Sequence, residues 1–387
     1  MKKQKLRHLN KPSWRIIVPI AVIVIGCATL LLTKAAQPTT SFEAESGNNT
    51  GSAQKFLSDS TASNRGYIKF GSNSNINRLL VNAPYFGAGL NWPKAGVNYQ
   101  TSYNTHVQRV GNKKPSMLRT FGTSLNGVWN WNNISNINVS GHNAGNWHSF
   151  KIDFQLAGSG SQNAAWTNSI KTIPINGRPK LITLHHEPED NVPASNSDEW
   201  ILNWIKSQVE VGKAIKAANH PDVVFGPIFT SAYYISGIPQ SDPNNTYNFV
   251  RVATENNLLD DLNMVFDFVG WDPYHEGSAS SPPRLTAPRD NAQYYFDEPF
   301  EFNDKYFKGK PFAVGETGYW ATHTDAQRKA WLQTVKQWTD NHAGKVLAIC
   351  YFDASLTEPW YLTLGPGGTI AEPYQEQSAL YWGSLYK

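Results

Sequence analysis

The feature that most limits the fold of this chain is an alternation of short apolar runs and longer amphipathic segments from residue 79 to the end. Eight runs have the length and composition of buried strands: 85–90, 116–121, 150–156, 179–185, 222–228, 266–271, 311–315 and 346–352. Helical spacing of apolar residues is clearest in 198–218, 325–340 and 375–386. Strands that alternate with helices form parallel sheets, and eight such repeats predict an α/β protein with a (β/α)8 barrel, or TIM barrel.

A doubly wound parallel sheet is the alternative architecture. Such a sheet usually carries a Gly-rich phosphate-binding turn after its first strand. Residues 86–91 match that turn poorly. We therefore favour the barrel, in which functional residues lie where the strands end.

The first 34 residues have the pattern of a membrane element. They carry seven Lys and Arg without an acidic residue, and residues 16–33 are uncharged. A helix of this length spans about 27 Å, the lower limit for crossing a bilayer core. We expect an uncleaved signal anchor in a single-pass cell-membrane protein, with the basic end in the cytoplasm and the rest outside. A cleaved signal peptide, which would give a secreted protein, and a lipoprotein box at Cys27 are the alternatives.

Composition excludes several classes of function. After residue 34 the chain carries 27 basic and 30 acidic residues, which excludes a nucleic-acid binder by charge. Two cysteines at opposite ends of the chain, Cys27 and Cys350, cannot build a disulfide framework or a Cys-based zinc site. The 14 Trp and 17 Tyr, with only 17% charged residues, suit a protein that stacks on neutral sugar rings. We expect a monomer that needs no metal or cofactor.

Residues 35–78 are rich in Ser, Asn, Thr and Gly, which is typical of an exposed linker. Within them, 41–47 and 66–70 resemble the opening strands of β-sandwich carbohydrate-binding modules. The stretch is too short to close such a sandwich, which needs about 100 residues. The predicted organisation is a basic segment with a membrane anchor or signal in 1–34, a linker with a short β segment in 35–78, and a catalytic barrel in 79–387.

Two glutamates stand at the ends of predicted strands. Glu187 follows the fourth run, where Pro188 ends strand pairing, and Glu316 ends the seventh. Strands four and seven lie nearly opposite in the ring, so the two side chains can approach to the ~5–5.5 Å that a retaining glycosidase requires. In that reaction one carboxyl is protonated and assists the leaving group, while the other is ionised and attacks the anomeric carbon. Glu189 is the rival acid, although we expect Pro188 to turn it away.

Three motifs connect these glutamates to a known family. A histidine, His186, directly precedes Glu187; residues 269–274 have the pattern V-G-x-D-x-Y; and residues 316–318 have the pattern E-x-G. With these motifs the chain, over about residues 80–387, resembles the retaining (β/α)8 glycoside hydrolases whose catalytic glutamates follow strands four and seven. The resemblance is closest to glycoside hydrolase family 26, known mainly for β-mannanases.

The resemblance implies a role for each matching residue. Glu187 would be the acid/base, Glu316 the nucleophile, and Tyr274 a hydrogen-bond partner of the nucleophile. Arg119 corresponds to the basic residue after strand two that orients the nucleophile, and a cation there would lower the pKa of Glu316. The predicted catalytic residues are therefore Glu187 and Glu316. The predicted substrate-binding residues are Arg119, His186, Trp271, Asp272, Tyr274, Trp320 and Trp360.

Two departures from the family leave the substrate open. Residues 149–155, assigned to strand three, lack the histidine that many mannanases have at the end of that strand, and residues 351–353 lack the tryptophan expected after strand eight. The leading function is a membrane-tethered, extracellular endo-glycanase that cleaves a β-1,4-linked, mannan-like polysaccharide by double displacement. A β-1,3-glucanase or xylanase on the same scaffold, and an inactive surface carbohydrate-binding protein, are the alternatives.

Overall fold

The computed structural model of the chain describes residues 53–56, 67–70, 74–90, 98–122, 131, 140–142, 145–150, 160–232, 239–275, 290–319, 324–353, 361–363 and 374–387. The chain divides into two compact units, Met1–Gly71 and Ser72–Lys387. The predicted membrane anchor, the 41–47 segment, Trp320 and Trp360 lie outside the described residues. None of the described helices is long and apolar enough to cross a membrane.

The first unit contains one antiparallel pair of strands. These are β1 (Ala53–Phe56) and β2 (Tyr67–Phe70), in a register that places Ala53 opposite Phe70. Strand β2 falls within the 66–70 segment that the sequence marks as a short strand. The second unit begins before residue 79, because its first helix, α2 (Ser74–Leu80), lies in the stretch predicted as linker.

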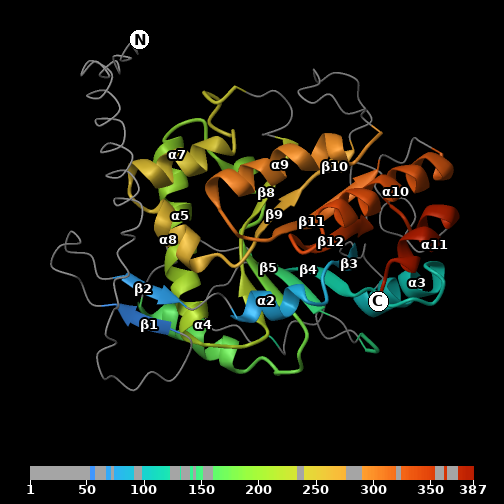
Figure 1. Cartoon of the computed structure of the whole chain (residues 1–387), viewed down its shortest axis with the longest axis horizontal. Coiled ribbons are helices and arrows are strands. Elements are labelled where there is room, and N and C mark those ends of the chain that lie inside the picture. Colours follow the sequence, from blue (N-terminus) through green and yellow to red (C-terminus); the bar gives the residue numbers. More distant parts are fainter. Residues whose placement is uncertain are drawn as a thin grey trace, which may run out of the picture. The chain divides into compact units, whose positions relative to one another are not determined.

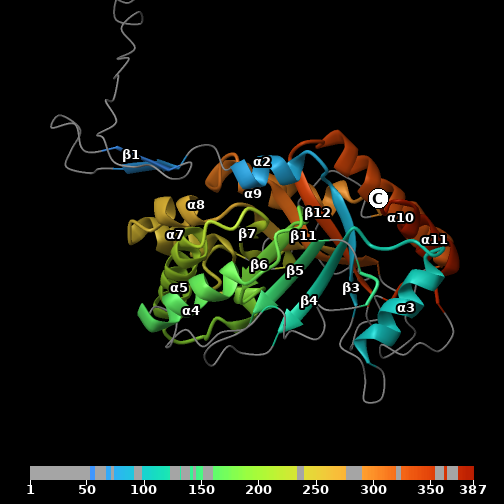
Figure 2. The same ribbon diagram turned by 90° about the horizontal axis from the view of Figure 1, so that it is seen from below.

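The second unit is a ring of parallel strands (Figures 1 and 2). Its strands are β3 (Tyr85–Leu90), β4 (Met117–Gly122), β5 (Gly145–Phe150), β6 (Lys180–Leu184), β7 (Val223–Phe225), β8 (Ile228–Thr230), β9 (Val269–Asp272), β11 (Phe312–Tyr319) and β12 (Val346–Asp353). Each pairs in parallel with its neighbour in the order β7-β6-β5-β4-β3-β12-β11-β9-β8. A short strand, β10 (Tyr274–His275), adds to β11.

The two ends of this order, β7 and β8, are halves of one strand. Only Gly226 and Pro227 separate them, so the chain itself closes the ring. The break keeps its ladder bonds, because Gly226 N donates to Ile182 O on one side and Gly270 N donates to Pro227 O on the other. Glycine is needed at 226, since a Cβ there would lie 2.2 Å from the carbonyl oxygen of Phe268. Eight strands in a parallel ring with helices outside fit the predicted TIM barrel.

Helices follow most of the strands. They are α3 (Tyr99–Arg109), α4 (Gly160–Lys171), α5 (Ser197–Ala217), α7 (Tyr247–Glu255), α8 (Leu259–Val265), α9 (Gln293–Tyr306), α10 (Asp325–Asn341) and α11 (Glu376–Ser384). Helix α5 buries Ile201, Trp204 and Ile205 at the spacing expected of one helical face. Helix α10 begins at a capping box, in which the Thr324 hydroxyl accepts from Gln327 N and the Gln327 side chain accepts from Thr324 N.

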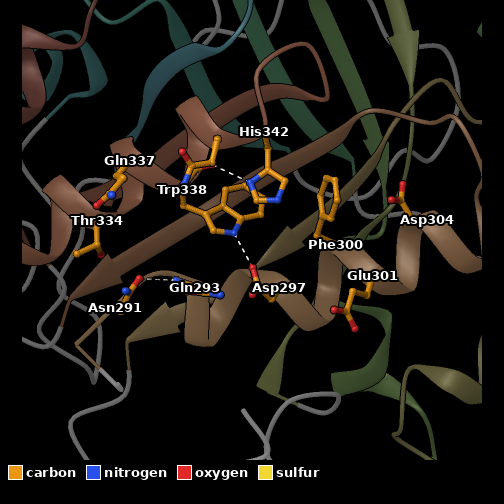
Figure 3. A pocket seen from close by; sticks show the side chains of 11 residues that line it. Asn291, Gln293, Asp297, Phe300, Glu301, Asp304, Thr334, Gln337, Trp338 and His342 are labelled. Atoms are coloured by element: carbon orange, nitrogen blue, oxygen red, sulfur yellow. Dashed lines mark hydrogen bonds between the residues drawn. The ribbon is translucent and has the colours of Figure 1, made fainter. Parts of the chain in front are cut away.

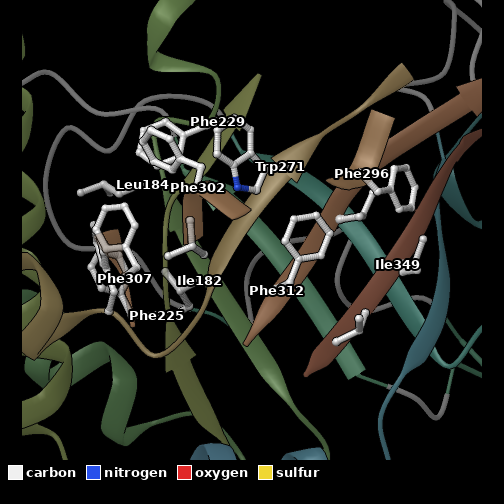
Figure 4. Packing of buried hydrophobic residues seen from close by; sticks show 14 of the residues in the cluster. Ile182, Leu184, Phe225, Phe229, Trp271, Phe296, Phe302, Phe307, Phe312 and Ile349 are labelled. Atoms are coloured by element: carbon white, nitrogen blue, oxygen red, sulfur yellow. The ribbon is translucent and has the colours of Figure 1, made fainter. Parts of the chain in front are cut away.

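The hydrophobic core has two layers. The outer layer lies between the strands and the helices and is rich in aromatic residues (Figure 4). The inner layer fills the ring and contains Met117, Trp147, Leu181, Val224, Ile228, Phe268, Ala313, Leu347, Ala348 and Cys350, joined by Ile76 and Leu79 of α2. Figure 2 shows α2 at the end of the sheet opposite the arrowheads of β4 and β5. Helix α2 therefore plugs the amino-terminal end of the barrel and leaves the carboxyl ends for the site.

The prediction for strand three is wrong. The sequence places it at 150–156, but the strand that pairs between β4 and β6 is β5, Gly145–Phe150. This strand contains Trp147 and His148 and lacks the aliphatic run that marks the others, which is why its composition hides it. Strand three therefore contains a histidine, His148, but next to the inward-facing Trp147 this residue lies on the outer face of the strand.

Shortening a buried side chain of α2 should destabilise the barrel. Leu79 is fully buried, so Leu79→Ala is expected to lower the free energy of unfolding by about 3 kcal/mol through lost burial and a residual cavity. The neighbouring Val81 is 81% exposed, and Val81→Ala should change stability by less than about 0.5 kcal/mol. Denaturant unfolding of both variants measures the difference, and equal effects would show that α2 does not seal the core.

Candidate active site

The end of β6 holds Glu187 in an unusual backbone conformation. His185 and Glu187 both have positive φ values, 53° and 49°, which non-glycine residues rarely adopt. Two ladder-like bonds hold this turn, from His185 N to Phe150 O (2.6 Å) and from Glu187 N to Ile228 O (2.9 Å). Pro188 then begins a short 3-10 helix, Pro188–Asn191. The neighbouring strands thus impose the conformation that fixes where the Glu187 side chain emerges.

A bulge in β11 aims Glu316. The register of β11 against β12 pairs Val314 with Ile349 and Thr317 with Tyr351, so β11 has one extra residue between these points. Strict alternation from Ala313, which faces the barrel interior, would turn Glu316 outward. A bulge re-aims side chains locally and is common beside active sites. In β11 the bulge is found where the Glu316 side chain contacts Tyr274 and Arg119 at the barrel mouth.

Two predicted residues hold Glu316. The Tyr274 hydroxyl donates to Glu316 Oε2 at 2.6 Å, and Arg119 Nη2 lies 3.5 Å from Glu316 Oε1. Arg119 is fully buried, with its guanidinium carbon 4.3 Å from the centre of the Phe121 ring and 5.5 Å from that of Trp147. The guanidinium also donates to Thr120 O. Aromatic rings and a carbonyl therefore fix the cation beneath the carboxylate.

The two glutamates differ in their electrostatic surroundings. Burial raises the pKa of Glu316, and Arg119 and the Tyr274 hydrogen bond oppose this rise. Burial and then the negative charge of Glu316 raise the pKa of Glu187 well above its usual range, with a smaller opposing effect from Arg119. The charge of Glu316 thus affects the pKa of Glu187. The arrangement favours an ionised Glu316 and a protonated Glu187.

Asp272 joins this group from the end of β9. It is buried, and burial followed by the charges of Glu316 and Glu187 raises its pKa well above the usual range for aspartate. The structure therefore brings together five predicted residues, which come from β4, the turn after β6, β9, β10 and β11. They are Arg119, Glu187, Asp272, Tyr274 and Glu316.

A cavity of about 170 Å³ lies beside Glu187. Phe121, Ser149 and His186 are among the residues that line it. The His186 Nε2 atom is 3.9 Å from Glu187 Oε2, and its ring centre is 5.5 Å from that of Phe121. The Ser149 hydroxyl is buried and has no hydrogen-bond partner among the described residues. The cavity thus offers an aromatic face and a hydroxyl for a polar ligand.

Glu189 is directed away from the site. Its carboxylate is fully buried and accepts from the Thr246 hydroxyl (2.7 Å) and from Thr230 N (3.3 Å). Burial raises its pKa to about 8. These bonds tie the short helix after β6 to the following segments, which is a structural role.

The prediction of Trp271 as a substrate-binding residue is wrong. The side chain is fully buried in the outer layer, where its ring lies 5.4 Å from that of Phe229 and 5.3 Å from that of Phe302 (Figure 4). Its indole N–H donates to Asn303 Oδ1. Neighbouring residues of a strand point to opposite faces, so Trp271 and Asp272 cannot both reach the barrel mouth. The alternation of side chains along a strand could therefore have identified Trp271 as a core residue from the sequence.

Sequence reasoning also missed residues of β5. Trp147 packs below Arg119 and donates to Thr183 Oγ1, and His148 Nδ1 is hydrogen-bonded to Thr120 Oγ1 at 2.6 Å. Burial, with a smaller effect of Arg119, lowers the pKa of His148 to about 3, so this ring is neutral. Correct placement of strand three would have revealed both residues.

A larger groove, of about 400 Å³, lies between α9 and α10 (Figure 3). Its central polar groups bond to one another: Trp338 Nε1 donates to Asp297 Oδ1, and His342 Nδ1 bonds to Trp338 O. His342 also stacks on the Trp338 ring at 4.1 Å. The groove contains none of the clustered carboxyls at the strand ends, and we do not assign the chemistry to it.

Comparisons with known proteins find only distant similarity. No protein-family model matches the chain, and a search of curated proteins finds no match. Among solved structures, an endo-β-1,3-glucanase of glycoside hydrolase family 128 from Sorangium cellulosum is 14% identical, with 77% of this chain and 98% of that chain covered and a TM-score of 0.41. A triple mutant of an endo-β-1,4-glucanase from Xanthomonas axonopodis pv. citri is 10% identical, with 78% and 100% covered and a TM-score of 0.46.

A hyperthermophilic β-glucosidase from Pyrococcus furiosus is 9% identical to the chain, with 79% and 95% covered and a TM-score of 0.48. Similarities this distant do not assign a reaction to the chain.

The raised pKa of Glu187 predicts a stability effect with a definite sign. The folded protein holds this proton more tightly than the unfolded chain, so stability falls as pH rises above the unfolded pKa. Glu187→Gln should therefore raise the free energy of unfolding measurably at pH 8 and change it little at pH 4. Urea unfolding at both pH values tests this, with exposed Glu301→Gln as the control. An equal effect at both pH values would contradict the assigned shift.

Proposed function

We propose that this protein is a retaining glycoside hydrolase in which Glu316 is the nucleophile and Glu187 the acid/base. One observation carries the proposal. Glu316 is held by a cation and a phenol, whereas Glu187 faces the negative charge of Glu316. Two carboxyls whose surroundings favour opposite protonation states are what double displacement at a sugar requires.

In the first step, Glu316 attacks the anomeric carbon as the glycosidic C–O bond breaks. Glu187 gives its proton to the departing oxygen, and the sugar is left as an ester of Glu316. The Tyr274 hydrogen bond occupies Oε2 of Glu316. This leaves Oε1, on the side of Arg119, as the attacking oxygen.

In the second step, Glu187 takes a proton from water, and the hydroxide displaces Glu316 from the sugar with a second inversion. Ester formation removes the charge of Glu316, which is the largest charge effect that raises the pKa of Glu187. The pKa of Glu187 then falls, and the group changes from an acid to a base. The same pair of residues thus serves both steps.

The proposed substrate is a β-linked polysaccharide. The cavity beside Glu187, with Phe121 and Ser149 in its lining, suits a sugar ring on the leaving-group side. We retain a β-1,4-linked, mannan-like glycan as the first candidate, by resemblance to family 26. A β-1,3-glucan and xylan are the other candidates.

For the N-terminal region, we propose that residues 16–33 anchor the protein in the cell membrane and leave the barrel outside. The support is the seven basic residues and no acid in the first 34, and the uncharged stretch within them. Membrane fractionation of the full-length chain, followed by protease treatment of intact cells, tests the location.

Removal of either glutamate should abolish hydrolysis without unfolding the barrel. Glu316→Ala and Glu187→Ala are expected to lower kcat by at least about 10³-fold, because each removes a group that acts on the reacting bond. A substrate with an activated leaving group should restore the first step in Glu187→Ala and not in Glu316→Ala. Glu301→Ala, an exposed control, should keep full activity.

The assay is a reducing-sugar measurement on mannan, xylan, β-1,3-glucan and β-1,4-glucan, with anomeric configuration followed by NMR. Retention of configuration on any of them supports the mechanism. Unchanged turnover by Glu316→Ala would contradict the proposed mechanism. Binding to a glycan without hydrolysis of any would favour the inactive carbohydrate-binding alternative.

A further inference from the structure

Asp272 is a buried carboxyl that the two-glutamate mechanism does not use. Its side chain is 1% exposed at the end of β9. Neither carboxylate oxygen has a side-chain partner among the described residues, and the backbone N–H of Glu316 is the polar group beside it. Asp272 is also not among the residues that line the cavity beside Glu187.

The β11 strand makes room for this carboxyl. A Cβ at Gly315 would lie 2.7 Å from Asp272 Oδ1 and 2.6 Å from Ile228 Cδ1. Real Cβ atoms do not approach so closely, so only glycine at 315 allows Asp272 to pack against the backbone behind Glu316. The glycine thus lets the Asp272 carboxyl lie against the strand segment that carries Glu316.

Charge balance limits how many of these carboxyls can be ionised. Among the described residues, Arg119 is the one Lys or Arg that pairs with any of Glu187, Asp272 and Glu316. One guanidinium balances one carboxylate, and further negative charges in a buried cluster are strongly unfavourable. His148 cannot supply the missing charge, because burial keeps its ring neutral. His186 lies 3.9 Å from Glu187 Oε2 and could balance that carboxyl alone. Asp272 has no cation paired with it among the described residues and must therefore hold a proton.

We propose that Asp272 is a positioning residue that stays protonated at neutral pH, so that Glu316 alone carries the negative charge opposite Arg119. The protonated carboxyl presents an O–H dipole to the neighbouring anion and stabilises it without adding charge. The positioning role rests on the proposed function of Glu316. The protonation itself does not.

The groups around Asp272 support this state. Glu316, Glu187 and Arg119 act on it from β11, β6 and β4, Tyr274 follows it in β10, and the Cys350 thiol lies on β12. Burial and the two glutamates raise the pKa of Asp272, and Arg119 and the Glu316 amide oppose them with a smaller effect. Tyr274 and Cys350 are themselves neutral, since burial raises the pKa of each.

Two variants separate this role from simple packing. Asp272→Asn keeps the shape and a neutral donor, so both limbs of the pH profile of kcat/KM should stay within about 0.3 pH units of wild type. Asp272→Leu keeps the volume but removes the donor, so the acid limb should move up by roughly one pH unit, a tenfold loss on that side. A downward shift of both limbs in Asp272→Asn would show that aspartate is normally ionised. If the acid limb does not move in Asp272→Leu, Asp272 contributes only to packing and has no positioning role.

Infrared difference spectroscopy tests the protonation without any substrate. At pH 7, the wild-type minus Asp272→Asn spectrum should contain the C=O stretch of a protonated carboxyl, which shifts on transfer to D2O. A difference confined to carboxylate bands would overturn the proposal. If the wild type hydrolyses no glycan, the proposed function fails, and this spectrum still decides the state of Asp272.

Discussion

A single guanidinium close to three carboxyls, of which Asp272 and Glu316 are buried, is the interaction on which the site depends. Arg119 stabilises the ionised form of Glu316, Glu187 and Asp272, but it can neutralise only one of them. Glu316 is the carboxyl that lies within ion-pair distance, and it alone also accepts from Tyr274. In the proposed mechanism, the position of this one cation therefore decides which carboxyl is ionised and acts as the nucleophile.

The barrel fixes this cation by packing. Met117 and Arg119 alternate on the inner side of β4, so the guanidinium lies above the inner hydrophobic layer. Trp147 and Phe121 flank it, and Tyr99 on α3 donates to the Arg119 carbonyl. Because these contacts fix the Arg119 guanidinium, the carboxylates have to be positioned next to it by their own segments of the chain. The left-handed turn at Glu187 and the bulge before Glu316 are the local irregularities that do so.

The sequence predicted the parts of the fold that depend on hydrophobic pattern and the parts of the site that depend on motif. Strands rich in aliphatic residues, such as β6 and β12, lie where their pattern indicates. Strand β5 does not, because Trp147 and His148 replace the aliphatic run. Glu187, Glu316, Arg119 and Tyr274 were identifiable because each belongs to a motif within or just after a predicted strand.

Other features need the tertiary structure. Strand alternation alone would turn Glu316 outward, and only the extra residue in β11 re-aims it. The packing of Asp272 against Gly315 depends on two strands that are distant in sequence. The electrostatic interactions among Glu187, Asp272 and Glu316 cannot be read from any local sequence pattern, because the three residues are far apart in the chain.

Trapping of the covalent intermediate tests the central claim most directly. A 2-deoxy-2-fluoro glycosyl fluoride matched to the preferred substrate slows the second step and lets the ester accumulate, and peptide mass spectrometry then locates it. The account predicts one fluoroglycosyl group on Glu316, and none in Glu316→Gln. A label on Glu187 or Asp272, or complete turnover with inverted configuration and no label, would contradict it.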